Sequence, residues 1–172
     1  YTQAIKQAID AGRLGRVVMV RRRHCLGTHL WPGFENTWHV KPQLNRGMWM
    51  DDASHPADLL YWMFGRPASV MAEIETLVNP MVPDDNGVAV FRWPDGMLGV
   101  LECSFTCVAA DDTTNIYGEK GTILQRWGDG VSCTPQLAAG AAERGLRYRL
   151  AGEAAWTQVD IPTPPSHGHR IS

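Results

Sequence analysis

The order of the secondary-structure patterns is the feature that most limits the fold of this chain. Residues 1–65 contain two helical patterns and one strand pattern, whereas the residues beyond 67 contain a series of strand patterns separated by turns. The first of these strands, over 70–78, places Val70, Ile74 and Val78 on one face. Helices followed by a run of antiparallel strands predict an α+β domain.

The expected elements follow from apolar periodicity and from glycine and proline stops. A helix over 1–11 ends at Gly12, a strand covers 16–24, a loop covers 25–45, and a second helix over 48–64 ends at Gly65. Further strands are expected over 70–78, 86–93, 97–108, 113–117, 122–127, 146–150 and 156–161, with a loop or short helical turn over 135–145. Pro94-Asp95-Gly96 predicts a hairpin turn.

Size and composition exclude several classes of protein. The 172 residues are 44% hydrophobic and 20% charged, which is typical of one globular domain. A net charge of −2 argues against a nucleic-acid-binding protein. No run approaches the ~20 apolar residues of a membrane span, and no signal peptide opens the chain, so we expect a cytoplasmic protein. The four cysteines lack metal-ligand spacing and are expected to be reduced, partly buried thiols.

The charges are unevenly distributed along the chain. Residues 1–50 carry eight basic and two acidic side chains, and the rest of the chain has an acidic excess. The run Arg21-Arg22-Arg23-His24 stands out within the basic part. Two interpretations remain open from the sequence, namely a site for an anionic ligand and a solvated strand edge that resists aggregation.

A polar stripe on the second helix is the first candidate for catalytic chemistry. Asp51, His55, Asp58 and Trp62 are spaced four, three and four residues apart, so a continuous helix aligns them. A carboxylate beside an imidazole makes the imidazole an effective proton donor or acceptor near neutral pH. A solvated surface stripe, or an Asp58 that only holds a structural His55, remains an alternative. Because Pro56 disfavours a helix interior, a helix that begins at Ser54 with Asp51 before it is also open.

Four motifs together make the sequence recognisable. They are Gly12-Arg-Leu-Gly15, Gly47-Met-Trp-Met-Asp51-Asp-Ala-Ser-His55-Pro-Ala-Asp58, Tyr61-Trp-Met-Phe-Gly65 and Ile116-Tyr-Gly-Glu-Lys-Gly121-Thr. In this order the motifs resemble the C-terminal domain of the Gfo/Idh/MocA oxidoreductases, the family of glucose-fructose oxidoreductase and inositol dehydrogenases. The resemblance is good over 1–127 and weak over 128–172.

The resemblance implies a fold and a place within a larger enzyme. It implies an open, predominantly antiparallel mixed β-sheet with helices packed on one face, like the C-terminal domain of glyceraldehyde-3-phosphate dehydrogenase. Residues 1–172 would be the substrate-binding and oligomerisation domain, cut at both ends, and the sheet face would join subunits of a homo-oligomer. NAD or NADP would be bound mainly by an N-terminal Rossmann domain that is absent here.

The resemblance also implies roles for individual residues. Asp51 and His55 would orient the hydroxyl group of a small-molecule substrate and relay its proton, and Asp58 would support the helix and His55. The sequence departs from the family pattern in four ways: Arg46 replaces a glycine, Ala53 replaces a glycine, Pro56 follows the histidine, and Met48-Trp49-Met50 replaces smaller aliphatic residues. The Asp51/His55 pair is retained, but the departures leave the substrate class open.

The expected substrates are sugars, inositols, other polyols and aromatic dihydrodiols. Aromatic side chains near the site are expected to stack on a ring, and basic ones to receive a carboxylate. The aromatic candidates are Trp31, Trp38 and Trp49; the basic ones are Arg21, Arg22, Arg23, His29, His39 and Lys41. Core packing beneath the long loop is the alternative for the tryptophans. No metal site is expected, because His29 and His39 alone are weak evidence for one.

The chain contains no glycine-rich phosphate-binding turn. It also lacks the Glu-Lys-Pro motif, whose lysine, as the resemblance implies, completes the site from the Rossmann domain. We therefore predict that this chain alone binds nicotinamide cofactor poorly and is inactive. A non-catalytic module for dimerisation or regulation that keeps the same fold is the alternative function.

Overall fold

The computed structural model describes residues 1–126 and 145–160, which form one 8-stranded sheet with helices on one side. The helices are α1 (Thr2–Asp10), α2 (Met48–Asp51) and α3 (Ser54–Phe64), with short 3₁₀ helices η1 (Thr28–Leu30), η2 (Phe34–Asn36) and η3 (Trp38–Val40). The strands are β1 (Val17–Cys25), β2 (Ser69–Glu75), β3 (Asn86–Arg92), β4 (Leu98–Ser104), β5 (Asp111–Gly118), β6 (Gly121–Arg126), β7 (Gly145–Leu150) and β8 (Thr157–Val159).

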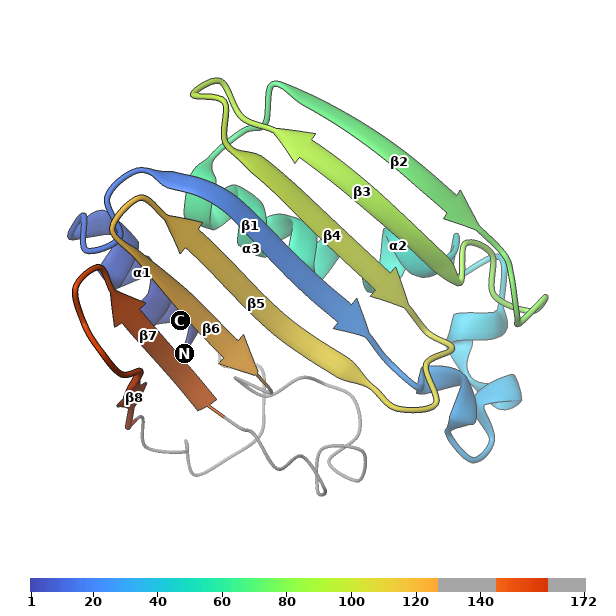
Figure 1. Cartoon of the computed structure of the whole chain (residues 1–172). Coiled ribbons are helices and arrows are strands. Elements are labelled where there is room, and N and C mark those ends of the chain that lie inside the picture. The colour runs from blue at the N-terminus through green and yellow to red at the C-terminus, as the bar shows by residue number, and fades with distance from the viewer. Residues whose placement is uncertain (127–144, 161–172) are drawn as a thin grey trace.

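The sheet is mixed and mostly antiparallel, which confirms the predicted fold class. Its strand order is β2-β3-β4-β1-β5-β6-β7-β8, and β1 with β4 is the one parallel pair in the described part of the chain (Figure 1). β1 therefore lies between β4 and β5 in the middle of the sheet. The interpretation of the arginine run as a solvated strand edge is wrong for this reason.

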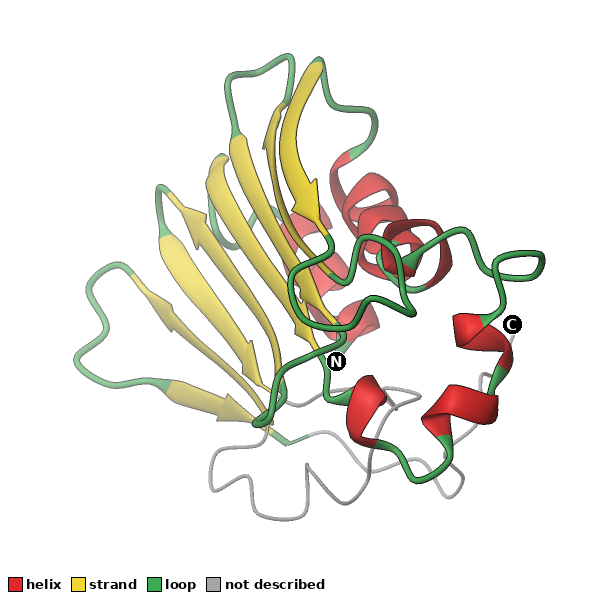
Figure 2. Ribbon diagram, turned by 90° about the vertical axis from the view of Figure 1, so that its right-hand side faces the viewer, coloured by secondary structure: helices red, strands yellow, loops and turns green. Residues whose placement is uncertain are grey.

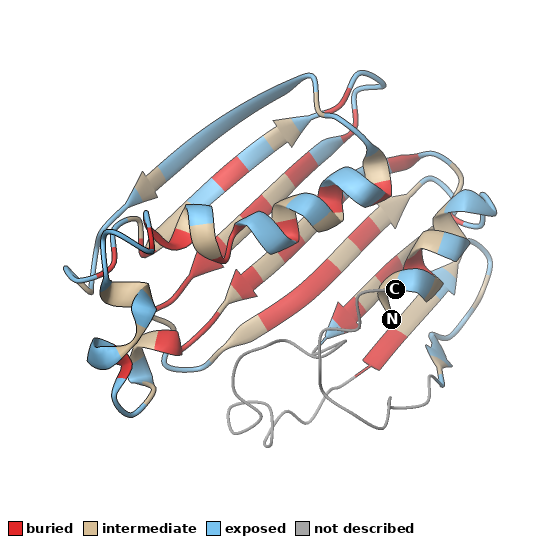
Figure 3. Cartoon of the chain, turned by 180° about the vertical axis from the view of Figure 1, so that it is seen from behind, coloured by how far each residue is buried: buried red, intermediate tan, exposed pale blue. Residues whose placement is uncertain are grey.

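The helices α1 and α3 lie against one face of the sheet, and the other face is not covered by any described element (Figure 2). The core lies between the helices and the strands and contains Ile5 of α1, Leu60 of α3 and Val20, Leu101 and Ile116 of the central strands. Buried residues form bands along the strands on this side of the sheet (Figure 3). Burial of each large apolar side chain contributes about 1.5–3 kcal/mol.

The turn between α1 and β1 explains two of the sequence motifs. Gly12 and Gly15 have positive φ angles of 66° and 67°, which turn the chain so that Leu14 is buried. The Leu14 carbonyl accepts a hydrogen bond from the Lys120 N–H at 2.8 Å, and a Cβ at Gly118 would collide with that carbonyl. The glycine of the β5–β6 hairpin is therefore required by close backbone approach.

The expected helix over 48–64 is two helices with a break at Asp52 and Ala53. Pro56 lies in the first turn of α3, where its missing N–H removes no helical hydrogen bond. The alternative that the helix begins near Ser54 is thus supported, but Asp51 ends α2 instead of lying in a loop. The continuous stripe of four side chains expected on one helix is wrong.

The remaining expectations concern the loops, the cysteines and a membrane span. The loop over 25–45 contains the three 3₁₀ helices, and Cys25, Cys103 and Cys107 are free thiols. The loop expected over 135–145 and the thiol of Cys133 lie outside the described residues. Within residues 1–126 and 145–160, no helix has the length and apolar character needed to cross a membrane.

Candidate active site

Asp51 is the centre of a small polar cluster at the end of α2. Its Oδ2 atom lies 2.8 Å from Nδ1 of His39 and 3.0 Å from Nδ2 of Asn45. Asn45 is fixed in turn, because its Oδ1 accepts the N–H of Gly47 at 2.9 Å. Two donors on one carboxylate oxygen hold Asp51 in a single orientation and leave Oδ1 without a hydrogen bond from residues 1–126 or 145–160.

The loop over 25–45 places His39 among aromatic rings. The imidazole stacks on Trp38 at a centroid distance of 4.1 Å and on Phe34 at 5.8 Å. Trp31 and Phe105 meet it edge-on. The Trp38 side chain is 46% exposed, so an indole surface lies one ring away from the Asp51 carboxylate.

His55 lies in the first turn of α3, four residues after Asp51, and its side chain is exposed. Its backbone N–H donates to the Asp52 carbonyl at 3.2 Å, which fixes the main chain of the turn between α2 and α3. Asp58 is exposed one turn further on, and its carboxylate has no hydrogen bond or ion pair with the described residues. Asp51 thus forms hydrogen bonds with His39 and Asn45, and the role of Asp58 as a support for His55 stays a prediction.

The other predicted site residues are less accessible to a ligand. Trp49 of α2 is half-buried and packs on β3, where a Cβ at Gly87 would collide with its indole ring. Arg22 is 8% exposed and bonds to Asp112, so it supports the fold and does not face solvent. Arg21 and Arg23 both pair with Glu102, which leaves the arginine run without an unpaired guanidinium group.

Arg22 belongs to a buried ionic cluster that the sequence did not reveal. The Asp112 carboxylate accepts hydrogen bonds from Arg22 at 2.5 and 2.9 Å, and its Oδ2 atom lies 3.0 Å from Nδ1 of His24. The Nε2 atom of His24 lies 2.7 Å from Oδ2 of Asp52, in the turn between α2 and α3. The cluster therefore links β1 and β5 to the turn that follows Asp51.

The pKa values of Asp112 and His24 are displaced in the directions that keep these two groups charged. Burial raises the pKa of Asp112, but the charge of Arg22 and the hydrogen bond with His24 outweigh burial and lower it. Burial lowers the pKa of His24, but hydrogen bonds with Asp112 and Asp52 outweigh burial and raise it.

Two signals in the sequence point to these missed residues. Val20, Arg22 and His24 share one face of β1, so a strand with a buried Val20 also buries two basic side chains that need acidic partners. Asn45 lies two residues before Gly47. An asparagine side chain in that position commonly accepts a hydrogen bond from the backbone N–H two residues later, as Asn45 does here.

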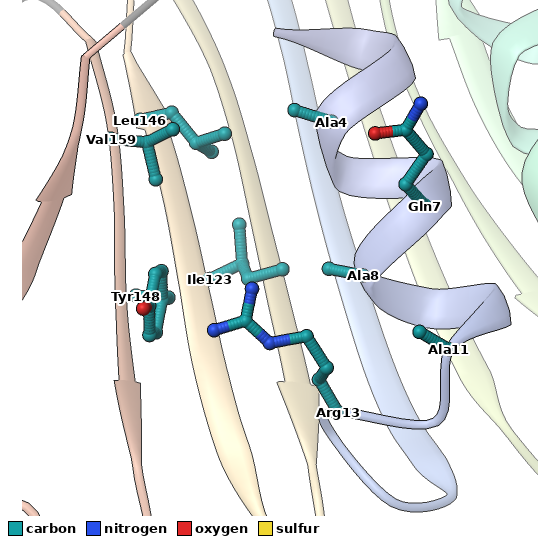
Figure 4. Close-up of a pocket in the computed structure, with 9 residues that line it drawn as sticks. All are labelled: Ala4, Gln7, Ala8, Ala11, Arg13, Ile123, Leu146, Tyr148 and Val159. Atoms are coloured by element: carbon teal, nitrogen blue, oxygen red, sulfur yellow. The ribbon is translucent and has the colours of Figure 1, made fainter.

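A cavity of about 320 Å³ lies elsewhere, between α1 and the strands β6, β7 and β8 (Figure 4). Its lining is mainly apolar, and the Arg13 guanidinium covers the Tyr148 ring at 4.5 Å. None of the predicted site residues lines this cavity. Among residues 1–126 and 145–160, no cluster of three His, Cys, Asp or Glu side chains has the geometry to hold a metal ion.

The comparison with protein-family models gives one match, over residues 2–124, to the GFO/IDH/MocA C-terminal domain. The chain belongs to this family. The match includes the turn at Leu14, the polar cluster at Asp51 and the β5–β6 hairpin, so the family motifs and the site geometry coincide.

Solved structures of dehydrogenases share the fold of this GFO/IDH/MocA domain. The WlbA dehydrogenase from Bordetella pertussis, in complex with NADH and UDP-GlcNAcA, is 32% identical over 72% of this chain and 38% of its own, with a TM-score of 0.64. Levoglucosan dehydrogenase, in complex with NADH and L-sorbose, is 18% identical over 93% of this chain and 45% of its own, with a TM-score of 0.73. An inositol dehydrogenase homolog from Azotobacter vinelandii, complexed with NAD⁺, is 18% identical over 92% of this chain and 40% of its own, with a TM-score of 0.71. The chain spans less than half the length of each of these proteins.

Proposed function

We propose that this chain is the substrate-binding part of an NAD(P)-dependent oxidoreductase that interconverts a secondary alcohol and a ketone. The alcohol belongs to a sugar, a polyol or a cyclic diol. The observation that carries the proposal is the Asp51 carboxylate, which His39 and Asn45 hold through Oδ2, while no residue of 1–126 or 145–160 donates a hydrogen bond to Oδ1. Membership of the GFO/IDH/MocA domain family supports the reaction class.

The chain's own residues account for the handling of the proton. Oδ1 of Asp51 accepts a hydrogen bond from the substrate hydroxyl and fixes its direction, because Oδ2 is already occupied. When the alcohol is oxidised, the hydroxyl proton passes along this hydrogen bond to Asp51, and the exposed imidazole of His55, four residues further on, relays it to solvent. His39 and Asn45 act through Asp51 and are positioning residues.

The exposed Trp38 ring supplies the surface on which a sugar or an aromatic ring lies. It stacks on His39, which bonds to Asp51, so the ring contact and the proton acceptor belong to one rigid unit. Lys41 is exposed in the same loop and has no partner among the described residues, which suits a substrate that carries a carboxylate.

The described residues do not fit the nicotinamide cofactor as its main binding site. Neither α2 nor α3 follows a strand through a glycine-rich turn, which is the arrangement that receives a dinucleotide pyrophosphate. We propose that another domain of the longer protein binds NAD or NADP, and the bound cofactor exchanges a hydride with the substrate. The chain alone is then expected to show no turnover.

Two experiments test the proposed function. The gene sequence upstream of Tyr1 should encode a βαβ unit with a glycine-rich turn. In the longer protein, Asp51→Asn and His55→Ala should each lower kcat for oxidation of the best polyol about 100-fold, because a positioned acid or base contributes 10²–10⁴-fold. Glu35→Gln, which changes an exposed carboxylate in the loop over 25–45, is the control and should keep kcat. Wild-type kcat in both site variants would contradict the roles of Asp51 and His55.

We also propose that the open face of the sheet joins two copies of the chain. Apolar side chains remain exposed on this face, among them Met19, Val90 and Leu98 with exposed fractions of 40%, 37% and 38%. Leu98→Glu should shift the protein to monomers in light scattering, whereas Leu44→Glu, in the loop before α2, should not. A longer protein that assembles through this face but oxidises no polyol would favour the non-catalytic dimerisation module.

A further inference from the structure

A histidine lies between two carboxylates under the candidate active site. His24 is 6% exposed, its Nδ1 lies 3.0 Å from Asp112 of β5, and its Nε2 lies 2.7 Å from Asp52 in the turn between α2 and α3. Three separate segments, β1, β5 and the α2–α3 turn, therefore meet at one imidazole ring. The mechanism proposed above does not use this residue.

With Asp52 and Asp112 ionised, the geometry requires that both ring nitrogens of His24 donate. An ionised carboxylate only accepts hydrogen bonds, so a neutral imidazole would turn one lone pair toward a carboxylate oxygen at hydrogen-bond distance. With an imidazolium, the two positive groups of Arg22 and His24 balance the two negative groups of Asp52 and Asp112. A buried cluster with no net charge avoids the large cost of an unpaired buried ion.

The groups that face His24 from the surrounding elements agree with this charge state. Arg22 on the same strand binds Asp112, and Thr114 of β5 contacts the Arg22 guanidinium at 3.3 Å. Cys103 of β4 lies opposite His24 in the parallel register, and burial raises the pKa of its thiol, so this neighbour is neutral. From the described residues of the helical layer, the Asp52 carboxylate therefore makes the hydrogen bond to the His24 imidazole.

Asp52 connects the ring to the residues that carry the chemistry. It directly follows Asp51, its backbone N–H donates to the Met48 carbonyl at 2.8 Å, and its carbonyl accepts the His55 N–H at 3.2 Å. The main chain on both sides of Asp52 is therefore fixed when its side chain is fixed.

We propose that His24, as an imidazolium held by Asp112, is a positioning residue that anchors Asp52 and thereby sets the relative placement of Asp51 and His55. This inference rests on the proposed function, because the placement matters for turnover only if Asp51 and His55 handle the substrate hydroxyl. Displacement of a catalytic group by about 1 Å can lower a rate 100-fold. His24 itself does not touch the substrate.

A matched pair of variants at Asp52 in the longer protein tests the anchor. Both variants remove the Asp52 charge and leave Arg22 and Asp112 as a balanced pair beside a neutral imidazole, but Asp52→Asn keeps an amide group that can hydrogen-bond to Nε2 of His24, whereas Asp52→Ala removes the link. We expect kcat to fall ~10- to 100-fold in Asp52→Ala and to stay within about twofold in Asp52→Asn, with KM for the cofactor unchanged in both. Both are assayed at temperatures where circular dichroism shows the protein to be fully folded. Equal kcat in the two variants would overturn the anchor.

Two further measurements keep the inference distinct from the proposed function. Nitrogen-15 NMR of the wild type should show both ring nitrogens of His24 protonated at pH 7.5, and Asp52→Ala should show one. Amide hydrogen exchange at 52–57 should be faster in Asp52→Ala than in Asp52→Asn, with α1 unchanged. An unprotonated ring nitrogen in the wild type, or equal exchange in the variants, overturns the inference even if the enzyme is active. A wild type that oxidises no polyol but gives these spectra and rates refutes the proposed function, and the anchor of the turn stands.

Discussion

The two faces of the sheet carry two ionic clusters that start from the same four residues of β1. Arg22 and His24 face the helices and bond to Asp112, whose side chain is 2% exposed. Arg21 and Arg23 face the open side and share Glu102, whose side chain is 27% exposed. The strand period of two distributes one basic run between a dry environment and a partly wet one.

The difference between the clusters lies in what happens when a partner is lost. Removal of one member of a buried pair leaves an uncompensated charge and costs about 3–5 kcal/mol, whereas exposed pairs contribute about 0–1 kcal/mol. On the helix side, the positive groups of Arg22 and His24 pair with the carboxylates of Asp112 and Asp52. On the open side Asp111 also pairs with Arg23, so the ions remain in part solvated on a face that we propose to be an interface.

The largest expected effect is the loss of Asp112. Asp112→Ala removes the acceptor of both Arg22 and His24, and we expect the free energy of unfolding to fall by about 3–5 kcal/mol in urea denaturation. Asp112→Asn, which keeps an acceptor oxygen for His24, should lose less. A loss below 1 kcal/mol in Asp112→Ala would show that the two faces are equivalent in energy.

An effect of intermediate size is the pH dependence of stability on the helix side. The pKa of His24 is raised in the folded chain above its usual value of 6.5, so its contribution is complete below about pH 6.5 and is lost as the pH rises through the folded pKa. Each unit between the two pKa values contributes about 1.4 kcal/mol.

The measurement is the free energy of unfolding in urea between pH 6 and 8.5, with Asp52→Ala as control. Both curves also fall as the pH approaches the usual pKa of a thiol, because burial and the neighbouring Cys107 raise the pKa of folded Cys25 to about 12 and ionisation then favours the unfolded chain, but this loss is common to the wild type and the control. Stability should fall with pH more steeply in the wild type than in Asp52→Ala. Parallel curves would mean that Asp52 contributes nothing to the raised pKa of folded His24.

The sequence predicted the elements of the fold well because local signals determine them. Gly12 and Gly65 stop helices, Pro94-Asp95-Gly96 turns the β3–β4 hairpin, and period-two patterns define the strands. The position of β1 in the middle of the sheet was missed, because the pairing of a strand with β4 and β5 depends on residues 70 or more positions away.

The site was predicted less completely for the same reason. Asp51, His39 and Trp38 were each named as candidates, and the structure brings them together through the loop over 25–45. The spacing of a continuous helix suggested Asp51 with His55 and Asp58, but the break at Asp52 and Ala53 changes that geometry. The partnership of His24 with Asp52 and Asp112 joins residues 28 and 88 positions apart, which no local pattern reports.

The smallest expected effect is the loss of Glu102 on the open face. Glu102→Ala removes the shared acceptor of Arg21 and Arg23, as Asp112→Ala does for Arg22 and His24, but Asp111 and water still solvate the arginines. We expect a loss of at most about 1 kcal/mol in urea denaturation of dilute protein, and less in 0.5 M salt, because exposed pairs are screened.

The same substitution should lower the free energy of unfolding by a larger amount at concentrations where light scattering shows dimers. A partner sheet that covers Arg21 and Arg23 would bury them without their acceptor. If the loss in free energy of unfolding is the same at concentrations that give monomers and dimers, the interface lies elsewhere. A cost near that of Asp112→Ala in dilute protein would remove the distinction between the two faces of the sheet.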